Sequence, residues 1–389
     1  MTTPSLGHPT LAEFGTTIFA ERSALASALD AVNLGQGFPD HDGPAEVLEA
    51  ARAAIAEGHN QYPPGIGVPA LLQAVADHQR DWYGIDLDPT SQVLVTVGAT
   101  EAIASVVLAL LRPGDEVVVF EPYYDSYAAT IALAGGDRRT VPLRFPDWAV
   151  DEAALRAAFS SRTRMVLLNS PHNPTGKVFT RDELELVARL AREHDALVVT
   201  DEVYEHLVFT DSPTPHVPMA SLPGMHERTL TIGSAGKTFS VTGWKVGWVS
   251  GPADLVAAAR AVKQFLTYVG SGPFQHATAT GLGLPRPVFD RIAADLQAQR
   301  DRLCVGLTSM GLPISRPDGG YFVIADLADW GVDDALAWCR ALPERAGVAA
   351  IPVSVFSDDK ESVRSLVRFA HCKRPEVLDE GLRRLAKAR

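Results

Sequence analysis

The sequence has little cysteine and an excess of negative charge. Only 3 of the 389 residues are cysteine, and Cys304, Cys339 and Cys372 form no C-x-x-C pair, which excludes a zinc knuckle or a dense disulfide framework and fits a reducing compartment. Lysine and arginine number 35 against 47 aspartate and glutamate, for a formal net charge of −12. Nucleic acid attracts basic surfaces, so it is not an expected partner.

Long apolar runs are also absent. The longest run, residues 102–111, is interrupted by Ser105 and is about half of the roughly 20 residues that span a bilayer. We therefore expect no membrane span and no membrane partner. The first residues carry Glu13, Glu21 and Arg22 within an apolar pattern, without the basic start of a signal peptide, so we expect a cytoplasmic protein.

What the sequence does contain is typical of a folded α/β protein. Apolar residues make up 46% and charged residues 21%, which is close to the average for globular domains. Short runs of valine, leucine and isoleucine alternate with helical patterns such as 101–111 and 181–194, and Thr180 with Glu183 forms a capping-box pattern. This alternation predicts a three-layer fold with a mostly parallel sheet. The predicted strands are 93–97, 116–120, 164–168, 196–200, 229–232 and 247–250.

The pattern changes near residue 286. A long polar helix through Arg302 is followed by short alternating strands at 321–325 and 365–370, which predicts a second, smaller α+β domain. The N-terminal segment has one helix with an apolar stripe, which would not be stable alone. We therefore predict an N-terminal segment over 1–45 that packs on the small domain, a large domain over 46–285 and a small domain over 286–389.

Residues with chemical potential follow the predicted strands. Ligands of open α/β sheets bind beyond the carboxyl ends of the strands. Residues 98–101, Gly-Ala-Thr-Glu, open a helix after the first strand, and the free N–H groups of a helix start favour a phosphate. An ordinary strand-to-helix turn is the alternative.

Two further loops have the same position. Residues 169–176, NSPHNPTG, contain many residues that fix backbone geometry, so the loop is either a structural turn or part of a site. Asp201 ends the fourth predicted strand, and Tyr204 follows three residues later. A carboxylate at a strand end is either a helix cap or a functional acid.

Lys237 is the strongest candidate for a reactive group. It lies among small residues in the segment 233–240, GSAGKTFS, and Lys245 follows eight residues later. A buried amine next to a second cation has a lowered pKa and can act as a Schiff-base nucleophile. A lone lysine is usually a solvated surface residue, but these flanking residues argue against a surface helix.

Taken together, these motifs resemble the pyridoxal 5′-phosphate (PLP)-dependent class I/II aminotransferases of fold type I. The sequence is most similar to the branch of kynurenine aminotransferase, glutamine transaminase K and methionine aminotransferase, and also to actinobacterial N-succinyldiaminopimelate aminotransferase-like proteins. The matching motifs are NLGQGFPD at 33–40, NQYPPGIG at 60–67, VTVGATEAI at 95–103, EPYYDSY at 121–127, NSPHNPTG at 169–176, DEVY at 201–204, SAGKTFSVTGWKVGW at 234–248 and VRFAHCK at 367–373.

The resemblance implies a catalytic role for three residues. Lys237 would hold the cofactor as a Schiff base and move a proton during catalysis. Asp201 would pair with the pyridine nitrogen of PLP, and Tyr204 would hydrogen-bond the ring oxygen together with Asn173. Tyr124 would stack on the pyridine ring, with core packing as the alternative.

The resemblance also implies how the phosphate and the substrate are held. The phosphate would be bound by Gly98, Ala99, Thr100, Ser234 and Lys245, where many relatives carry arginine in place of Lys245. Tyr62 would reach it from the neighbouring subunit, which implies a homodimer with shared active sites.

Substrate contacts are implied for a third group of residues. Arg368 would grip the α-carboxylate, unless it is a salt-bridged strand arginine, and Asn173 would assist. Gly37 would bring backbone close to the same carboxylate. The side-chain pocket would draw on Ile18, Phe38, Tyr123 and the partner's Tyr268.

The implied function is ping-pong transfer of an amino group between an L-amino acid and a 2-oxo acid. Aromatic residues around the pocket favour a large apolar, aromatic, sulfur-containing or glutamine-like side chain, and we assign no second arginine for a distal carboxylate. The alternatives are a cysteine-S-conjugate β-lyase and an N-succinyldiaminopimelate aminotransferase. A non-catalytic PLP-sensing regulator would need a DNA-binding domain, for which we find no basic N-terminal extension.

Overall fold

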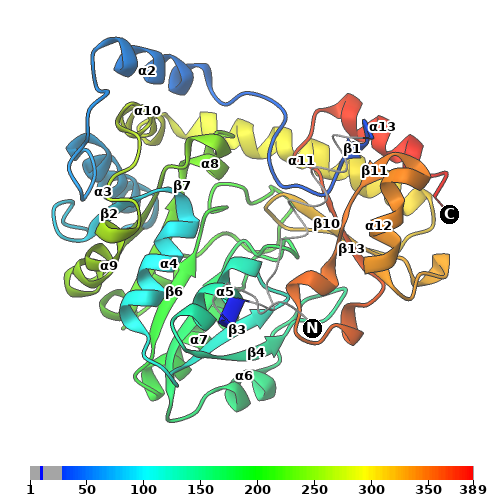
Figure 1. The fold of residues 1–389 in the computed structure, drawn as a ribbon, viewed down its shortest axis with the longest axis horizontal. Coiled ribbons are helices and arrows are strands. Elements are labelled where there is room, and N and C mark those ends of the chain that lie inside the picture. Colours follow the sequence, from blue (N-terminus) through cyan, green and yellow to red (C-terminus); the bar gives the residue numbers. More distant parts are fainter. Residues whose placement is uncertain (1–8, 12–28, 389) are drawn as a thin grey trace, which may run out of the picture.

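The computed structural model describes residues 9–11 and 29–388. Its centre is a seven-stranded sheet in the order β2-β8-β7-β6-β5-β3-β4 (Figure 1). Strand β8 runs antiparallel to its neighbours β2 and β7, and the other neighbouring pairs are parallel, so the predicted α/β fold is confirmed. The strands are β2 (Val93–Thr96), β3 (Glu116–Glu121), β4 (Asp137–Pro142), β5 (Thr163–Asn169), β6 (Leu197–Asp201), β7 (Thr229–Ser234) and β8 (Gly247–Ser250).

Helices cover both faces of this sheet. Alternate residues of the central strands point to opposite faces, so Val117 and Val119 of β3 pack in one core and Val118 and Phe120 in the other. The first core includes α4 (Gly98–Leu110), α5 (Asp125–Leu133) and α9 (Ala253–Leu266), and the second includes α6 (Glu152–Ala158) and α7 (Arg181–Glu193). A further core surrounds α2 (Ala45–Ala56), α3 (Pro69–Tyr83) and α10 (Gly272–Leu282).

The six predicted strands are all present, with small shifts at their ends. The capping box of Thr180 and Glu183 begins α7 as predicted. Strand β4 was missed because it lies at the edge of the sheet, where only one of its six residues, Val141, is buried. It therefore lacks the apolar run that marks a buried strand.

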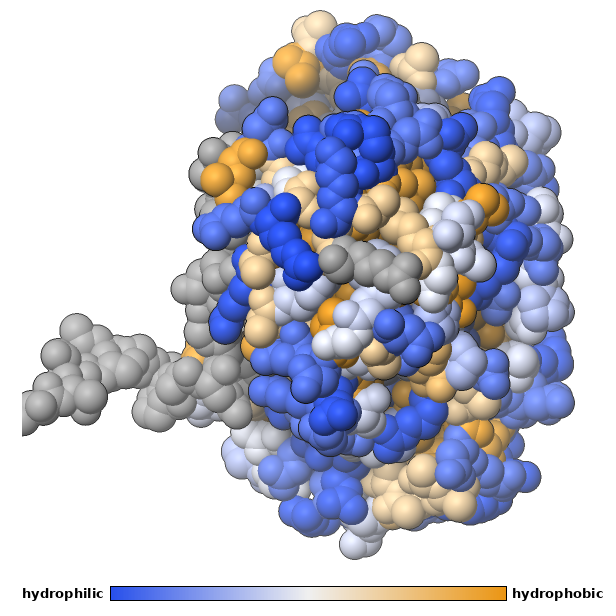
Figure 2. All heavy atoms as spheres, turned by 90° about the vertical axis from the view of Figure 1, so that its right-hand side faces the viewer, coloured by the Kyte–Doolittle hydropathy of each residue, from blue (hydrophilic) through white to orange (hydrophobic). Residues whose placement is uncertain are grey.

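The C-terminal elements build a separate sheet, to the right in Figure 1. Its four strands are antiparallel in the order β12-β13-β10-β9. They are β9 (Ile314–Ser315), β10 (Phe322–Asp326), β12 (Ile351–Pro352) and β13 (Leu366–Ala370), accompanied by α11 (Arg286–Ser309), α12 (Ala335–Ala346) and α13 (Pro375–Leu385). The outer face of this part is mainly hydrophilic, with scattered apolar residues (Figure 2).

The segment before α2 joins this C-terminal part. Strand β1 (Val32–Asn33) pairs in parallel with β11 (Val348–Ala349), and the amide of Ala370 donates to the carbonyl of Leu34 at 2.6 Å. Leu34 is fully buried in the core formed by α11, α12 and α13. The domain boundaries at 45/46 and 285/286 stay a prediction. None of the helices in the described ranges is both long and apolar enough to cross a bilayer.

Candidate active site

A cavity of about 480 Å³ lies beyond the carboxyl ends of the parallel strands. Its walls come from the loops that follow β2, β3, β5, β6 and β7, from residues 36–38 and from β10 and β13. Of the residues predicted to bind the cofactor or the substrate carboxylate, all except Tyr62 line it. They are Gly37, Gly98, Ala99, Thr100, Tyr124, Asn173, Asp201, Tyr204, Ser234, Lys237, Lys245 and Arg368. The structure therefore brings together residues that lie more than 300 positions apart in the chain.

Lys237 is held by the short helix α8 (Ala235–Thr238), which follows β7 directly. The Ser234 hydroxyl caps this helix by accepting from the amide of Gly236 at 3.2 Å, and the Tyr321 hydroxyl donates to the carbonyl of Lys237 at 3.0 Å. Burial lowers the pKa of the Lys237 amine, and the cation of Lys245 adds to this effect. A lowered pKa increases the fraction of neutral amine, which is the nucleophilic form.

Asp201 ends β6 with its carboxylate in the cavity wall. Burial raises the pKa of Asp201 to about 6, although a hydrogen bond from Tyr127 opposes the shift. The Tyr127 hydroxyl donates to Oδ2 at 2.6 Å. A buried carboxylate of this kind is a partner for a cationic group in the cavity.

Tyr127 was missed by the sequence analysis, although a signal for it exists. It lies three residues after Tyr124 on α5, and residues at this spacing share one face of a helix. The rings of Tyr124 and Tyr127 meet edge to face with centroids 5.7 Å apart. One tyrosine thereby lines the cavity, and the other orients the carboxylate of Asp201.

Tyr204 and Asn173 lie on neighbouring loops. Burial raises the pKa of the Tyr204 phenol well above its usual value, so this hydroxyl stays protonated and able to donate. The amide of Asn173 donates to Oδ1 of Asn169 at 2.6 Å, and Nδ2 of Asn169 donates to the carbonyl of Asp201 at 2.7 Å. Asn169, a second residue that was missed, thus ties the loop of Asn173 to the end of β6.

The start of α4 forms one end of the cavity. Its N-cap residue, Val97, makes no side-chain cap, so the first N–H groups of the helix are not satisfied by a capping side chain. Gly98 has φ of +74°, and a Cβ at this position would lie 3.1 Å from Nζ of Lys245. A lysine amine and a helix start in one place make an anion site.

Arg368 lies on β13 at the opposite wall and is only 1% exposed. Its Nη1 donates to Oδ1 of Asn173 at 3.0 Å and its Nη2 to the carbonyl of Gly35 at 2.9 Å. The guanidinium lies 3.8 Å from the ring centre of Phe322. Burial lowers the pKa of Arg368 to about 10, so it stays charged at neutral pH.

Packing also requires glycine at position 37, which the sequence analysis did not predict. A Cβ at this position would fall 2.3 Å from the Phe322 ring, so only glycine lets this segment lie against the ring beneath Arg368. Phe322 and Asp125 also line the cavity and were not predicted.

Three expected pocket residues have a different outcome. Tyr62 does not line the cavity of its own chain and is 82% exposed, with its ring 5.8 Å from that of Tyr268. Tyr123 was wrongly placed in the pocket, because it is buried and its hydroxyl donates to Asp358 at 2.6 Å. Ile18 lies outside the described residues, and Phe38 lines the cavity as expected.

The fold and the cavity define a class of enzyme, in which an open α/β sheet presents a lysine amine, a strand-end carboxylate and an anion site. Comparisons with known proteins agree. The solved N-succinyldiaminopimelate aminotransferase from Mycobacterium tuberculosis is 51% identical, with a TM-score of 0.96 over 98% of this chain and 100% of that one. The solved methionine aminotransferase from Escherichia coli is 39% identical, with a TM-score of 0.92 over 98% and 100%. Kynurenine--oxoglutarate transaminase 3 from Rattus norvegicus is 40% identical over 93% of this chain and 86% of its own.

The model of the family "Aminotransferase class I and II" matches residues 30–385. The chain belongs to this family and is an aminotransferase. Its substrates are small molecules, namely amino acids and oxo acids.

Proposed function

We propose that the enzyme binds PLP in this cavity and transfers amino groups by a ping-pong mechanism. The proposal rests on one observation: the Lys237 amine, the Asp201 carboxylate and the anion site at α4 line the same cavity. These groups fit the aldehyde, the ring nitrogen and the phosphate of PLP respectively. Ser234, Ala99 and Thr100 line the same cavity as Lys245 and would complete the phosphate contacts.

Each group of residues has a distinct task in this proposal. When bound, PLP supplies an electron sink for the substrate. Lys237 would hold the cofactor and then, as a free amine, move the proton at the substrate Cα. Asp201 would keep a positive charge on the ring nitrogen, Tyr124 would support the ring face, and Tyr204 with Asn173 would bind the ring oxygen.

Arg368 would bind the substrate α-carboxylate through its planar fork. Two carbonyl oxygens and the Phe322 ring already hold the guanidinium in place, so substrate binding would cost little side-chain entropy. Phe38 and Gly37 lie on the segment above it and would help to exclude water.

For the amino donor we propose a large uncharged side chain, of the apolar, aromatic, sulfur-containing or glutamine-like type. The support is the lining: Phe38, Ile103 and Phe322 are apolar, and the additional ionisable residue Asp125 is an acid, which would repel a distal carboxylate. The second candidate is N-succinyldiaminopimelate, which is favoured by the 51% identity with the aminotransferase that carries this name.

The experiment is a panel of amino donors tested against 2-oxoglutarate and pyruvate, read from the change in cofactor absorbance in each half-reaction. We expect methionine, glutamine and aromatic amino acids to react faster than aspartate. A strong preference for N-succinyldiaminopimelate would replace this substrate proposal with the second candidate. Lys237→Ala should abolish turnover and the absorbance of lysine-bound PLP, whereas Lys360→Ala, at an exposed position, should leave both unchanged.

We also propose a cytoplasmic homodimer with shared active sites. Its support is an apolar surface outside the cavity, where Tyr62, Phe265 and Tyr268 are 82%, 85% and 54% exposed. Such exposure is typical of a surface that a second subunit covers. In the dimer Tyr62 would reach the phosphate in the partner's cavity.

Mixing two inactive variants tests the shared site. A heterodimer of Lys237→Ala and Tyr62→Ala chains has one intact site if Tyr62 acts across the interface. Mixed subunits should then regain activity that neither parent has. If the mixture stays as inactive as its parents while light scattering shows dimers, Tyr62 does not act in the partner's site.

A further inference from the structure

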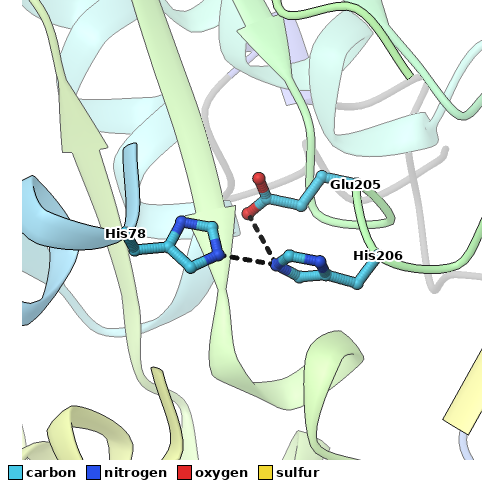
Figure 3. A group of neighbouring side chains, drawn as sticks. All are labelled: His78, Glu205 and His206. Carbon is cyan, nitrogen blue, oxygen red and sulfur yellow. Dashed lines mark hydrogen bonds and ion pairs between the residues drawn. The ribbon is translucent and has the colours of Figure 1, made fainter. Parts of the chain in front are cut away.

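A second cluster of ionisable side chains lies outside the cavity. His78 comes from α3, and Glu205 and His206 come from the turn after β6 (Figure 3). The three residues are 4%, 6% and 8% exposed. Figure 3 shows both side chains of the turn and the side chain of His78 directed toward one point.

The donor atoms are close together. The two Nε2 atoms of His78 and His206 are 2.8 Å apart, and Nε2 of His206 lies 3.9 Å from Oε1 of Glu205. One ligand atom from each of the three residues lies within 4.8 Å of the other two. Around a tetrahedral metal with bonds of about 2.0–2.2 Å, ligand atoms are about 3.4 Å apart, and the two observed distances bracket this value.

The two imidazoles contact each other through a hydrogen bond. Their Nε2 atoms are 2.8 Å apart, so one Nε2 donates a proton to the other. A metal ion between the rings would replace this hydrogen bond, and the proton would move to Nδ1 of the donating ring, which leaves both Nε2 lone pairs free to bind the ion.

The carboxylate of Glu205 is not fully hydrogen-bonded. Oε2 of Glu205 is buried and has no hydrogen-bond partner within the described part of the chain. A buried polar atom in this state costs free energy unless it finds a partner. The other oxygen, Oε1, faces Nε2 of His206 at 3.9 Å (Figure 3). A cation between the three side chains would bind Oε1, and its charge would also stabilise the neighbouring Oε2.

We propose that His78, Glu205 and His206 form a binding site for Zn²⁺. Two imidazole nitrogens and one carboxylate oxygen are a ligand set that zinc uses in proteins, whereas magnesium and calcium prefer oxygen ligands. The site is separate from the cavity, since none of the three residues lines it.

Neighbouring groups support the ligands from outside. Tyr83 hydrogen-bonds Glu205, and Nε2 of His216 lies 3.0 Å from Oε2 of Glu202. Such outer partners orient the ligands of metal sites. The aromatic rings of Trp82 and Phe289 pack against His206, and the guanidinium of Arg286 lies 4.0 Å from the ring centre of Trp82. The carboxylates of Glu202 and Glu205 would offset this positive charge and part of the charge of a divalent ion.

The position of the site gives it a structural role. Glu205 follows Tyr204, which lines the cavity, so a metal that joins α3 to this turn would fix the turn from outside the cavity. Zinc should therefore raise the thermal stability of the PLP-loaded protein. It is not required for the chemistry that Lys237 performs.

The test uses the full-length, PLP-loaded protein, treated with a chelator, incubated with Zn²⁺ and dialysed. Elemental analysis should find about one zinc ion per chain, and His78→Gln and Glu205→Gln should each lose it. His276→Ala is the matched control, because it removes one ring of the stacked pair His59–His276 elsewhere on the protein, and it should keep the zinc.

A spectroscopic measurement keeps the test decisive if a variant fails to fold. Co²⁺ bound to the wild-type protein at this site should give visible absorption bands of a nitrogen- and oxygen-ligated ion, and Zn²⁺ should abolish them. Wild-type protein that retains no zinc after dialysis, or a folded His78→Gln variant that retains as much as wild type, would overturn the proposal.

Discussion

Replacing Tyr127 with phenylalanine tests how the protein sets the charge on Asp201. The change removes the hydroxyl that donates to Oδ2 of Asp201 at 2.6 Å and leaves the packing of the ring. A hydrogen bond to a charged group contributes about 1.5–3 kcal/mol. Since one pKa unit corresponds to about 1.4 kcal/mol, the loss should raise the pKa of Asp201 by about one to two units.

The consequence is large at neutral pH. Wild-type Asp201, with a pKa of about 6, is about nine-tenths ionised at pH 7 in the protein without cofactor. In Tyr127→Phe the ionised fraction should fall to between about one half and one tenth. Because an ionised carboxylate is needed to pair with a protonated ring nitrogen, PLP affinity should then reach its maximum at a higher pH.

The assay is a titration of cofactor-free protein with PLP between pH 5.5 and 9. The binding curve of Tyr127→Phe should be displaced by about one to two pH units toward higher pH. Tyr123→Phe is the control, because it removes a buried hydroxyl that bonds Asp358 instead. If a folded Tyr127→Phe variant gives the same pH dependence as wild type, the hydroxyl does not set the protonation of Asp201.

Three further predictions follow from the same cavity. Burial raises the pKa of Asp201 in the folded protein to about 6, above its usual value of 3.8, so this residue destabilises the cofactor-free protein as pH rises from about 4 to 6. Urea unfolding should show Asp201→Asn more stable than wild type by about 3 kcal/mol at pH 7.5 and equally stable at pH 4. An equal difference at both pH values would contradict this. Arg368→Lys should raise KM for amino acids about tenfold or more, because lysine cannot bind a carboxylate through two N–H groups; steady-state kinetics that show an unchanged KM would exclude this role. Gly98→Ala should weaken PLP binding about tenfold, measured by equilibrium titration, because φ is positive there and the added Cβ would lie 3.1 Å from Nζ of Lys245. Gly114 also has a positive φ, but a Cβ there would have no atom within 4 Å. Gly114→Ala should therefore affect stability alone.

Much of the fold and the cavity lining could be predicted from the sequence, because each depends on local patterns. Buried strands are short apolar runs, and the loops after them contain conspicuous residues such as Lys237 and Asp201. The exposed edge strand β4 has no such run and was missed.

Contacts between side chains far apart in sequence were harder to predict. The bond from Tyr127 to Asp201 depends on which face of α5 meets the end of β6, and spacing along the chain does not fix this. His78 and His206 are separated by 128 residues, so no motif connects them. The proposed task of Tyr62 involves a second chain, which one sequence specifies only through resemblance.

The pairing of the N-terminal segment with the C-terminal sheet also affects the order of biosynthesis. Gly35 accepts from Arg368 across 333 residues, and β1 pairs with β11 near the end of the chain. A ribosome therefore releases residues 32–35 long before it makes their partners. The wall of the cavity that contains Arg368 can form only when translation is nearly complete. A prematurely terminated chain would therefore lack the residue proposed to bind the substrate carboxylate, even if the central sheet had already folded.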